Sequence, residues 1–152
     1  MESTRSIHVL IFDGFADWEP AHALAELRRW GKGAVRAVGF TSAPVRRLLE
    51  TERPVAAICA ATLALGRARV LDERRHTSNM RSYLPTHVPE YAGASHYVEA
   101  AAVRDKHVIT ASGLAPVDFA REVFAELKIF GVADEALWYA MFKEGRLPEA
   151  AI

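Results

Sequence analysis

Cysteine is scarce in this 152-residue chain, which contains only one, Cys59. A single cysteine excludes an internal disulfide and is typical of a reducing compartment. No apolar run approaches the roughly 20 residues that span a membrane, and residues 1–6 lead into the first predicted strand without the hydrophobic region of a signal peptide. We therefore expect a cytoplasmic protein with no membrane partner.

A surplus of charge of one sign is also lacking, because 19 Lys and Arg residues balance 19 Asp and Glu residues. Nucleic-acid-binding domains carry a clustered basic surplus, so we expect no nucleic-acid partner. The six histidines have no paired ligand spacing, and neither a glycine-rich dinucleotide motif nor a P-loop occurs. We therefore expect no metal and no other cofactor.

Apolar runs and amphipathic stripes alternate along the chain. The runs predict strands at residues 7–12, 34–40, 55–58 and 107–111, with a further extended stretch at 95–103. The stripes predict helices at residues 17–30, 60–68, 115–127 and 134–142. Strand, helix and strand at this spacing form βαβ units, which predicts an α/β fold with parallel pairing. We expect a single domain over residues 1–152.

Cys59 lies where a predicted strand ends and a predicted helix begins. The unpaired N–H groups and the dipole of a helix N-terminus favour a thiolate, which is the reactive form of cysteine. The alternative is a small buried hydrophobic residue, since free cysteine is among the most buried residue types. The position of Cys59 alone favours the reactive interpretation.

Polar residues follow three of the predicted strands. They lie in residues 13–19, at Cys59 and in residues 112–116. Ligands bind outside the carboxyl ends of strands in open parallel sheets, so we expect these segments to face one crevice. A neutral Glu19 in that crevice could donate a hydrogen bond to a thiolate, whereas an ionised Glu19 would raise the pKa of the thiol.

This set of segments resembles the ThiJ/PfpI superfamily, the class I glutamine-amidotransferase-like proteins. The motifs that carry the resemblance are Asp13-Gly14-Phe15-Ala16-Asp17-Trp18-Glu19, Ala57-Ile58-Cys59, residues 74–79, and residues 103–111 with Ser112-Gly113. They follow in the family's order, and the resemblance extends from Ile7 to about Phe142. It implies a flavodoxin-like three-layer α/β/α sandwich with a mostly parallel sheet, and a homodimer.

By this resemblance, Cys59 would be a nucleophile on a strained turn and Glu19 its protonated partner. The backbone N–H of Ala60 would supply part of an oxyanion hole. The substrate would be a small carbonyl compound or amide, in a hydrolase, amidase, glyoxalase-like or deglycase-like reaction. The candidate substrate-binding residues are Asp17, Asn79, Ser112 and Gly113.

One departure from the family concerns the base. Protease-like members place a histidine directly after the cysteine, where this chain has Ala60. His96, one position from the family's other histidine, or His76 could substitute as the base. A surface or core role is the alternative for both.

A second departure lies before the Cys59 strand. The family has a further strand pair there and a buried strand that ends in Pro-Gly-Gly, whereas here residues 42–47 run directly into residues 48–52. Either the fold is truncated, with a partner completing it, or a stretch of the chain is missing from the sequence. We expect the second, with the Cα atoms of Arg47 and Leu48 much further apart than the ~3.8 Å of a trans peptide.

A different function class is also open. Cys59 could serve an oxidative-stress sensor or chaperone, in which it is oxidised to a sulfinic acid without turnover. An accessible thiol of low pKa would suit both the enzyme and the sensor.

Overall fold

Five strands in the described part of the chain form two sheets. The computed structural model describes residues 6–10, 16–30, 34–38 and 43–147, and the side chains of residues 16–30 and 45–147. β1 (Ser6–Leu10) and β2 (Ala34–Val38) pair in parallel. β3 (Val55–Ile58) pairs in parallel with β5 (Val108–Ala111), and β5 pairs antiparallel with β4 (Ala102–Asp105). The pairing among these strands is therefore mostly parallel, as predicted.

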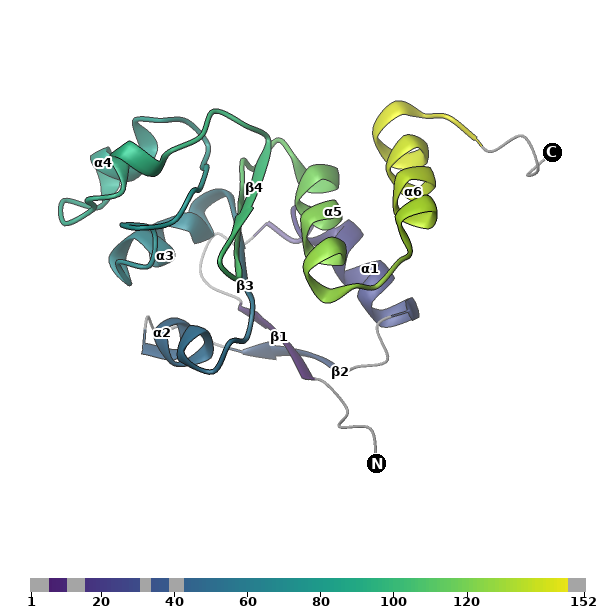
Figure 1. Ribbon diagram of the computed structural model, residues 1–152, viewed down its shortest axis with the longest axis horizontal. Coiled ribbons are helices and arrows are strands. Elements are labelled where there is room, and N and C mark those ends of the chain that lie inside the picture. The colour runs from purple at the N-terminus through teal and green to yellow at the C-terminus, as the bar shows by residue number, and fades with distance from the viewer. Residues whose placement is uncertain (1–5, 11–15, 31–33, 39–42, 148–152) are drawn as a thin grey trace.

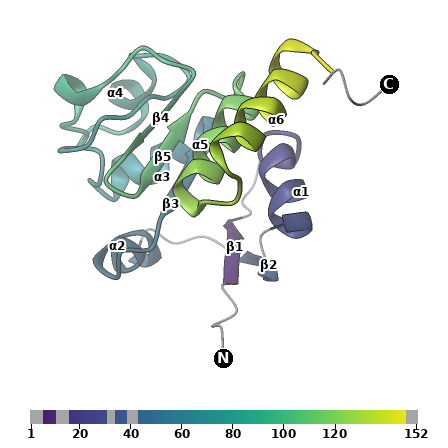
Figure 2. The ribbon, with the colours of Figure 1, turned by 45° about the vertical axis from the view of Figure 1, so that its right-hand side comes forward.

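Helices cover both faces of the β3–β5–β4 sheet (Figure 1). On one side lie α2 (Ala43–Glu50), α3 (Thr62–Arg67) and α4 (Tyr83–His87). On the other side α5 (Pro116–Leu127) packs on the sheet, and α1 (Ala21–Trp30) and α6 (Val132–Glu144) pack on α5. Figure 2 shows α5 and α6 in front of α1 on that side.

Alternate strand residues contribute to two separate core clusters. Ala57 and Val108 pack with residues of α2, α3 and α4, whereas Ile58, Ile109 and Ala111 pack with residues of α1, α5 and α6. Successive side chains of a strand point to opposite faces, so a sheet buried on both sides must divide its apolar residues in this way. The predicted flavodoxin-like three-layer α/β/α arrangement is confirmed.

Most predicted elements coincide with observed ones, and two helices were not predicted. β3 has the predicted bounds, and α5 begins one residue later than predicted. Helix α2 occupies residues interpreted as a connection, and its Val45 and Leu49, one turn apart, join the same cluster as Ala57. Helix α4 contains Pro85 in its first turn. The predicted strand ends at residues 11–12 and 39–40 lie outside the described residues, as do Asp13, Gly14 and Phe15 of the first motif.

Arg47 and Leu48 lie within helix α2. The Thr51 N–H donates to the Leu48 carbonyl oxygen at 3.1 Å, and the Thr51 hydroxyl donates to the Arg47 carbonyl oxygen at 3.2 Å. The two residues are consecutive in one continuous helix, so the predicted separation of their Cα atoms is wrong. That the chain lacks a family segment at this point stays a prediction from the sequence.

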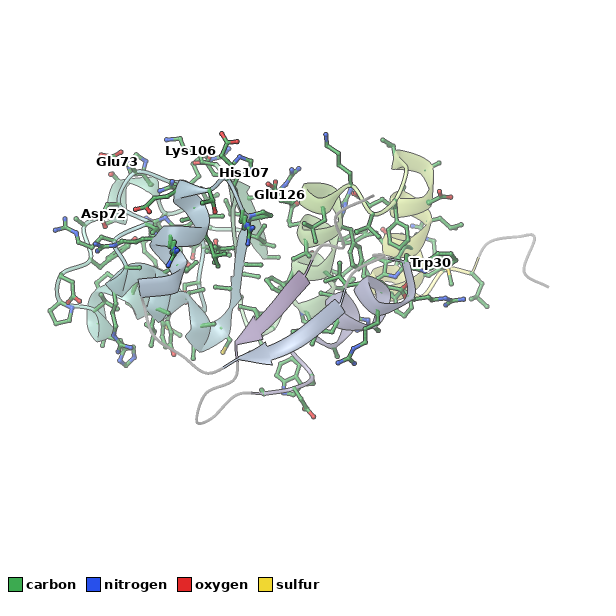
Figure 3. All side chains as sticks on the ribbon, turned by 90° about the horizontal axis from the view of Figure 1, so that it is seen from below. Trp30, Asp72, Glu73, Lys106, His107 and Glu126 are labelled. Carbon is green, nitrogen blue, oxygen red and sulfur yellow. The ribbon has the colours of Figure 1, made fainter. Side chains whose placement is uncertain are left out.

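The turn between β4 and β5 lies at the end of the sheet opposite Cys59, because His107 precedes β5 whereas Cys59 follows the parallel strand β3. Its residues Lys106 and His107 have φ values of 45° and 63°, as tight two-residue turns of the type I′ class require. Lys106 Nζ donates to the Glu73 carbonyl oxygen at 3.0 Å, and Figure 3 shows Glu73, Lys106, His107 and Glu126 along one edge of the molecule.

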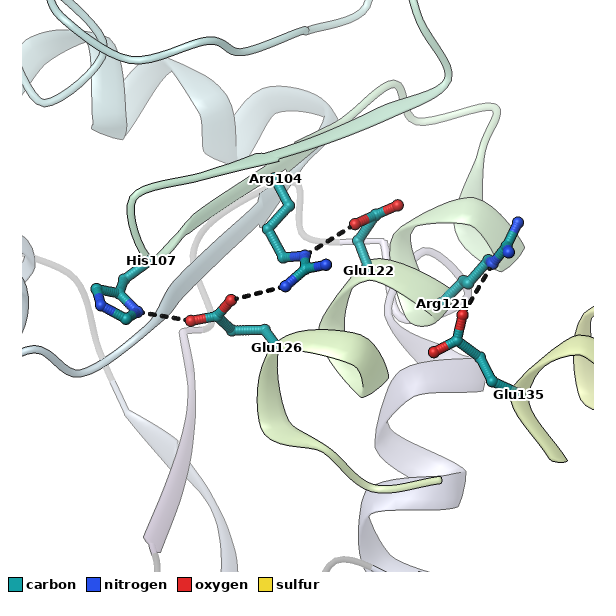
Figure 4. A network of polar contacts seen from close by, with 6 residues as sticks. All are labelled: Arg104, His107, Arg121, Glu122, Glu126 and Glu135. Carbon is teal, nitrogen blue, oxygen red and sulfur yellow. Dashed lines mark hydrogen bonds and ion pairs between the residues drawn. The ribbon is translucent and has the colours of Figure 1, made fainter. Parts of the chain in front are cut away.

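A chain of ion pairs fastens this hairpin to α5 (Figure 4). His107 Nδ1 lies 2.6 Å from Glu126 Oε1, and the Arg104 guanidinium reaches Glu126 at 3.2 Å and Glu122 at 3.0 Å. Arg104 and His107 are substantially exposed, so the pairs contribute modestly to stability. They orient α5 on the sheet at the end away from Cys59.

Candidate active site

Cys59 occupies a strained turn between β3 and the short 3₁₀ segment Cys59–Ala61. Its φ of 56° lies in the left-handed region, whereas Ile58 before it is extended. A non-glycine residue in this region costs about 1–2 kcal/mol, and such residues gather at functional sites. The Thr62 hydroxyl donates to the Cys59 carbonyl oxygen at 2.7 Å and fixes the turn. The strained turn that the family resemblance implied is therefore present.

Gly113 lies against both Cys59 and Glu19. A Cβ atom added to Gly113 would lie 2.8 Å from Cys59 Sγ and 3.0 Å from Glu19 Oε1. These distances are too short for any side chain, so only glycine allows Cys59 and Glu19 to meet the backbone here. The prediction that these three strand ends meet is confirmed for Glu19, Cys59 and Gly113.

Asn79 links the thiol to Gly113. Its Nδ2 donates to Cys59 Sγ at 3.3 Å, and its Oδ1 accepts the Gly113 N–H at 2.9 Å. The sequence placed Asn79 and Gly113 together as substrate-binding candidates. The structure places both residues at the thiol. A role in substrate binding stays a prediction.

Burial is the largest influence on the Cys59 thiol and raises its pKa. The Asn79 hydrogen bond lowers the pKa, the Glu19 hydrogen bond and charge raise it, and the Ala60 N–H lowers it. The net pKa lies above the ordinary 9.0, because burial outweighs the two donors. That the helix N-terminus favours a thiolate stays a prediction.

The structure does not bring either candidate histidine to the thiol. His76 is fully buried, and its Nδ1 and Nε2 lie 2.7 Å from the Arg74 carbonyl oxygen and 2.6 Å from the Tyr91 hydroxyl. His96 is half-buried beside His76. Among the hydrogen bonds of the described residues, none joins either ring to Cys59. Both ring nitrogens of His76 are thus already engaged.

The other candidates take peripheral places. Asp17 is exposed, and the Ser112 hydroxyl accepts the Leu114 N–H at 3.3 Å within its own loop. Sequence reasoning missed Thr62 and Ser78, whose buried hydroxyls lie 2.7 Å apart. The spacing of Thr62 three residues after Cys59, which suits a side-chain bond back to the Cys59 carbonyl, was a usable signal.

Residues 16–30 and 45–147 contain no gathering of three side chains able to hold a metal ion. No helix in the described ranges has both the length and the hydropathy needed to cross a membrane.

Two curated proteins are similar to part of this chain. An uncharacterized protease of Bacillus subtilis, YoaZ, is 42% identical over 89 residues, which are 59% of this chain and 42% of that protein. A second, YdeA of the same organism, is 39% identical over 75 residues, which are 49% of this chain and 38% of that protein. The chain thus matches less than half the length of either relative.

Solved structures match almost the whole chain. A thiJ/pfpI family protein of Bacillus anthracis has a TM-score of 0.85 and 26% identity, over 95% of this chain and 94% of that one. The DJ-1 superfamily protein Atu0886 of Agrobacterium tumefaciens has a TM-score of 0.80 and 29% identity, over 95% of this chain and all of that one. The model of the DJ-1/PfpI family matches residues 39–126, more than half of the sequence. With the strained cysteine turn inside that match, the chain belongs to the DJ-1/PfpI family.

Proposed function

We propose that this chain is a cysteine-dependent hydrolase of the DJ-1/PfpI type that acts on a small amide or reactive carbonyl compound. The observation that carries the proposal is the half-buried Cys59 on a left-handed turn, with Cys59 Sγ and Glu19 Oε1 both against Gly113. Such a turn holds the sulfur rigidly, so that little conformational entropy of the nucleophile is lost during the reaction.

Glu19 is the acid–base group in this proposal. The raised pKa of Cys59 keeps the thiol protonated at neutral pH, so the attacking sulfur must lose its proton as the bond forms. In the first step the S–H proton passes to the Glu19 carboxylate, the C–S bond forms, and the carbonyl π pair moves onto oxygen. The Ala60 N–H is the donor available to the developing oxyanion.

The same proton completes hydrolysis of an amide. Glu19 returns it to nitrogen as the C–N bond breaks, which leaves a thioester on Cys59. Water then adds to the thioester and gives a proton to Glu19, and that proton returns to sulfur as the C–S bond breaks. An α-oxoaldehyde would share the first step, since its aldehyde carbon accepts the sulfur in the same way.

The placement of Glu19 beside the half-buried Cys59 sulfur supports turnover over oxidation sensing. A carboxylate there can take the thiol proton as the sulfur attacks, whereas oxidation of a sensor cysteine needs no such acceptor.

The test compares Cys59→Ser and Cys59→Ala with the unchanged protein on small chromogenic amides and on an α-oxoaldehyde. We expect both variants to lose about 100-fold or more of kcat/KM, because the nucleophile is gone. Ser95→Ala, at an exposed position, is the matched control and should retain full activity. Retained turnover in Cys59→Ala would refute the proposal. An unchanged protein that turns over none of these substrates, yet gains two oxygen atoms at Cys59 with peroxide, would favour the sensor instead.

A further inference from the structure

The contacts of Asn79 define which way its amide points. Oxygen and nitrogen of an asparagine side chain are interchangeable in shape, and the hydrogen-bond network decides between them. The Gly113 backbone N–H can only donate, and it lies 2.9 Å from one end of the amide. That end must be Oδ1, so the NH₂ group faces Cys59 Sγ at 3.3 Å.

Thr77 and Ser78, which precede Asn79, fix the position of the Asn79 side chain beside Cys59 through buried hydrogen bonds. The Thr77 N–H donates to the Thr110 hydroxyl at 2.9 Å, and the Thr77 hydroxyl donates to the Ala100 carbonyl oxygen at 2.8 Å. The Ser78 hydroxyl pairs with that of Thr62. Thr77 and Ser78 are at most 2% exposed, so residues 77–79 are anchored to β5 and α3 by buried hydrogen bonds.

We propose that Asn79, the only asparagine in the sequence, is a catalytic residue that holds the Cys59 sulfur as a thiolate once Glu19 has taken its proton. An N–H donor favours the charged form of the sulfur and opposes the burial that disfavours it. Asn79 does not titrate, so it donates at every pH and leaves proton transfer to Glu19. This role rests on the proposed function and adds a hydrogen-bond donor at the thiol beside the proton acceptor Glu19.

The opposing effects on the thiol agree with this division. Asn79 is the largest of the influences that lower the pKa of Cys59, and Glu19 acts in the opposite direction. In such a site the fixed donor stabilises the attacking thiolate, and a separate group accepts its proton.

The test exploits the single cysteine, because alkylation by iodoacetamide then reports on Cys59 alone. The rate is measured against pH, without substrate, for the unchanged protein, Asn79→Asp and Asn79→Ala. The aspartate can still accept the Gly113 N–H but presents an anionic oxygen to the sulfur. We expect its alkylation inflection to move up by about one pH unit or more, about a tenfold loss of thiolate at a given pH. Asn79→Ala should shift it in the same direction by a smaller amount.

Ser82→Asp, which adds a carboxylate at an exposed position nearby in the chain, is the control and should leave the inflection unchanged. Circular dichroism checks that each variant is folded, and Asn79→Ala decides the matter if the aspartate variant does not fold. Unchanged inflections in the folded variants would overturn the role of Asn79. This outcome is distinguishable from a failure of the proposed function, which is tested by the turnover of the unchanged protein and of the Cys59 variants.

Discussion

Gly113→Ala places one methyl group at the point where three segments meet. The new Cβ would lie 2.8 Å from Cys59 Sγ, 3.0 Å from Cys59 Cβ and 3.0 Å from Glu19 Oε1. Gly113 is not in the left-handed region, so alanine carries no backbone penalty and the effect is steric. Contact at an ordinary 3.5–4.0 Å requires the sulfur or the loop to move by roughly 1 Å.

Two consequences follow from a displacement of that size. Overpacking in a filled site costs about 1–3 kcal/mol of the free energy of unfolding. A shift of about 1 Å in a reacting group costs about 100-fold in rate. Urea denaturation measures the first quantity, and iodoacetamide alkylation together with turnover measures the second.

Two other glycines supply the controls. A Cβ on Gly93 would lie 2.5 Å from the Leu71 carbonyl oxygen, so Gly93→Ala should destabilise the fold while a folded sample keeps its thiol reactivity. Gly66 in α3 has its nearest neighbour at 3.4 Å, so Gly66→Ala should leave both quantities nearly unchanged or improve stability. If Gly113→Ala keeps the alkylation profile and the turnover of the unchanged protein, the geometry assigned to the site is wrong.

Three further variants test the fold around the site, each by urea denaturation. Burial raises the pKa of Glu126, but its ion pairs, that with His107 first, outweigh burial and leave the pKa below the ordinary 4.5. The ion pairs therefore stabilise the fold above pH 4.5, and this stabilisation is lost as the pH falls through the lowered pKa of Glu126. Glu126→Gln should thus be less stable than the unchanged protein at pH 7 and should lose less stability on acidification. An equally steep acid loss in the variant would contradict this. Thr62→Val leaves the buried Ser78 hydroxyl without its partner and should cost about 1–3 kcal/mol; no change would mean that the pair is not formed. Phe124→Ala empties a fully buried site and should cost about 3–5 kcal/mol, and a loss below about 1 kcal/mol would contradict the core described here.

Local pattern was sufficient for the elements on which the site stands. The apolar run that Pro54 opens and Cys59 closes is the strand observed, and the stripe at Ala120, Val123 and Phe124 is the buried face of α5. Helix α2 was missed because residues 42–52 were weighed as a connection and not for their helical period. Helix α4 spans five residues around a proline, too few for a periodic signal.

The members of the site were predictable, but their relations were not. Cys59, Glu19 and Gly113 were named from their positions after strands, and Asn79 from the family resemblance. That Asn79 bridges Gly113 and the sulfur depends on the relative placement of β3, β5 and the anchored loop, which no local pattern encodes. The effect of burial on the thiol pKa was not predictable, because burial is a property of the assembled fold. A homodimer, a cytoplasmic location and a single domain stay predictions.

The left-handed φ of Cys59 means that the stability of the fold and the proposed activity favour different residues at position 59. Glycine adopts this conformation without a steric penalty, so Cys59→Gly should exceed Cys59→Ala in stability by about 1 kcal/mol. A mutant library selected only for folding should therefore enrich glycine at this position, and one selected for turnover should retain cysteine. A lineage released from catalysis would be expected to discard the thiol early, because the fold itself gains from the loss.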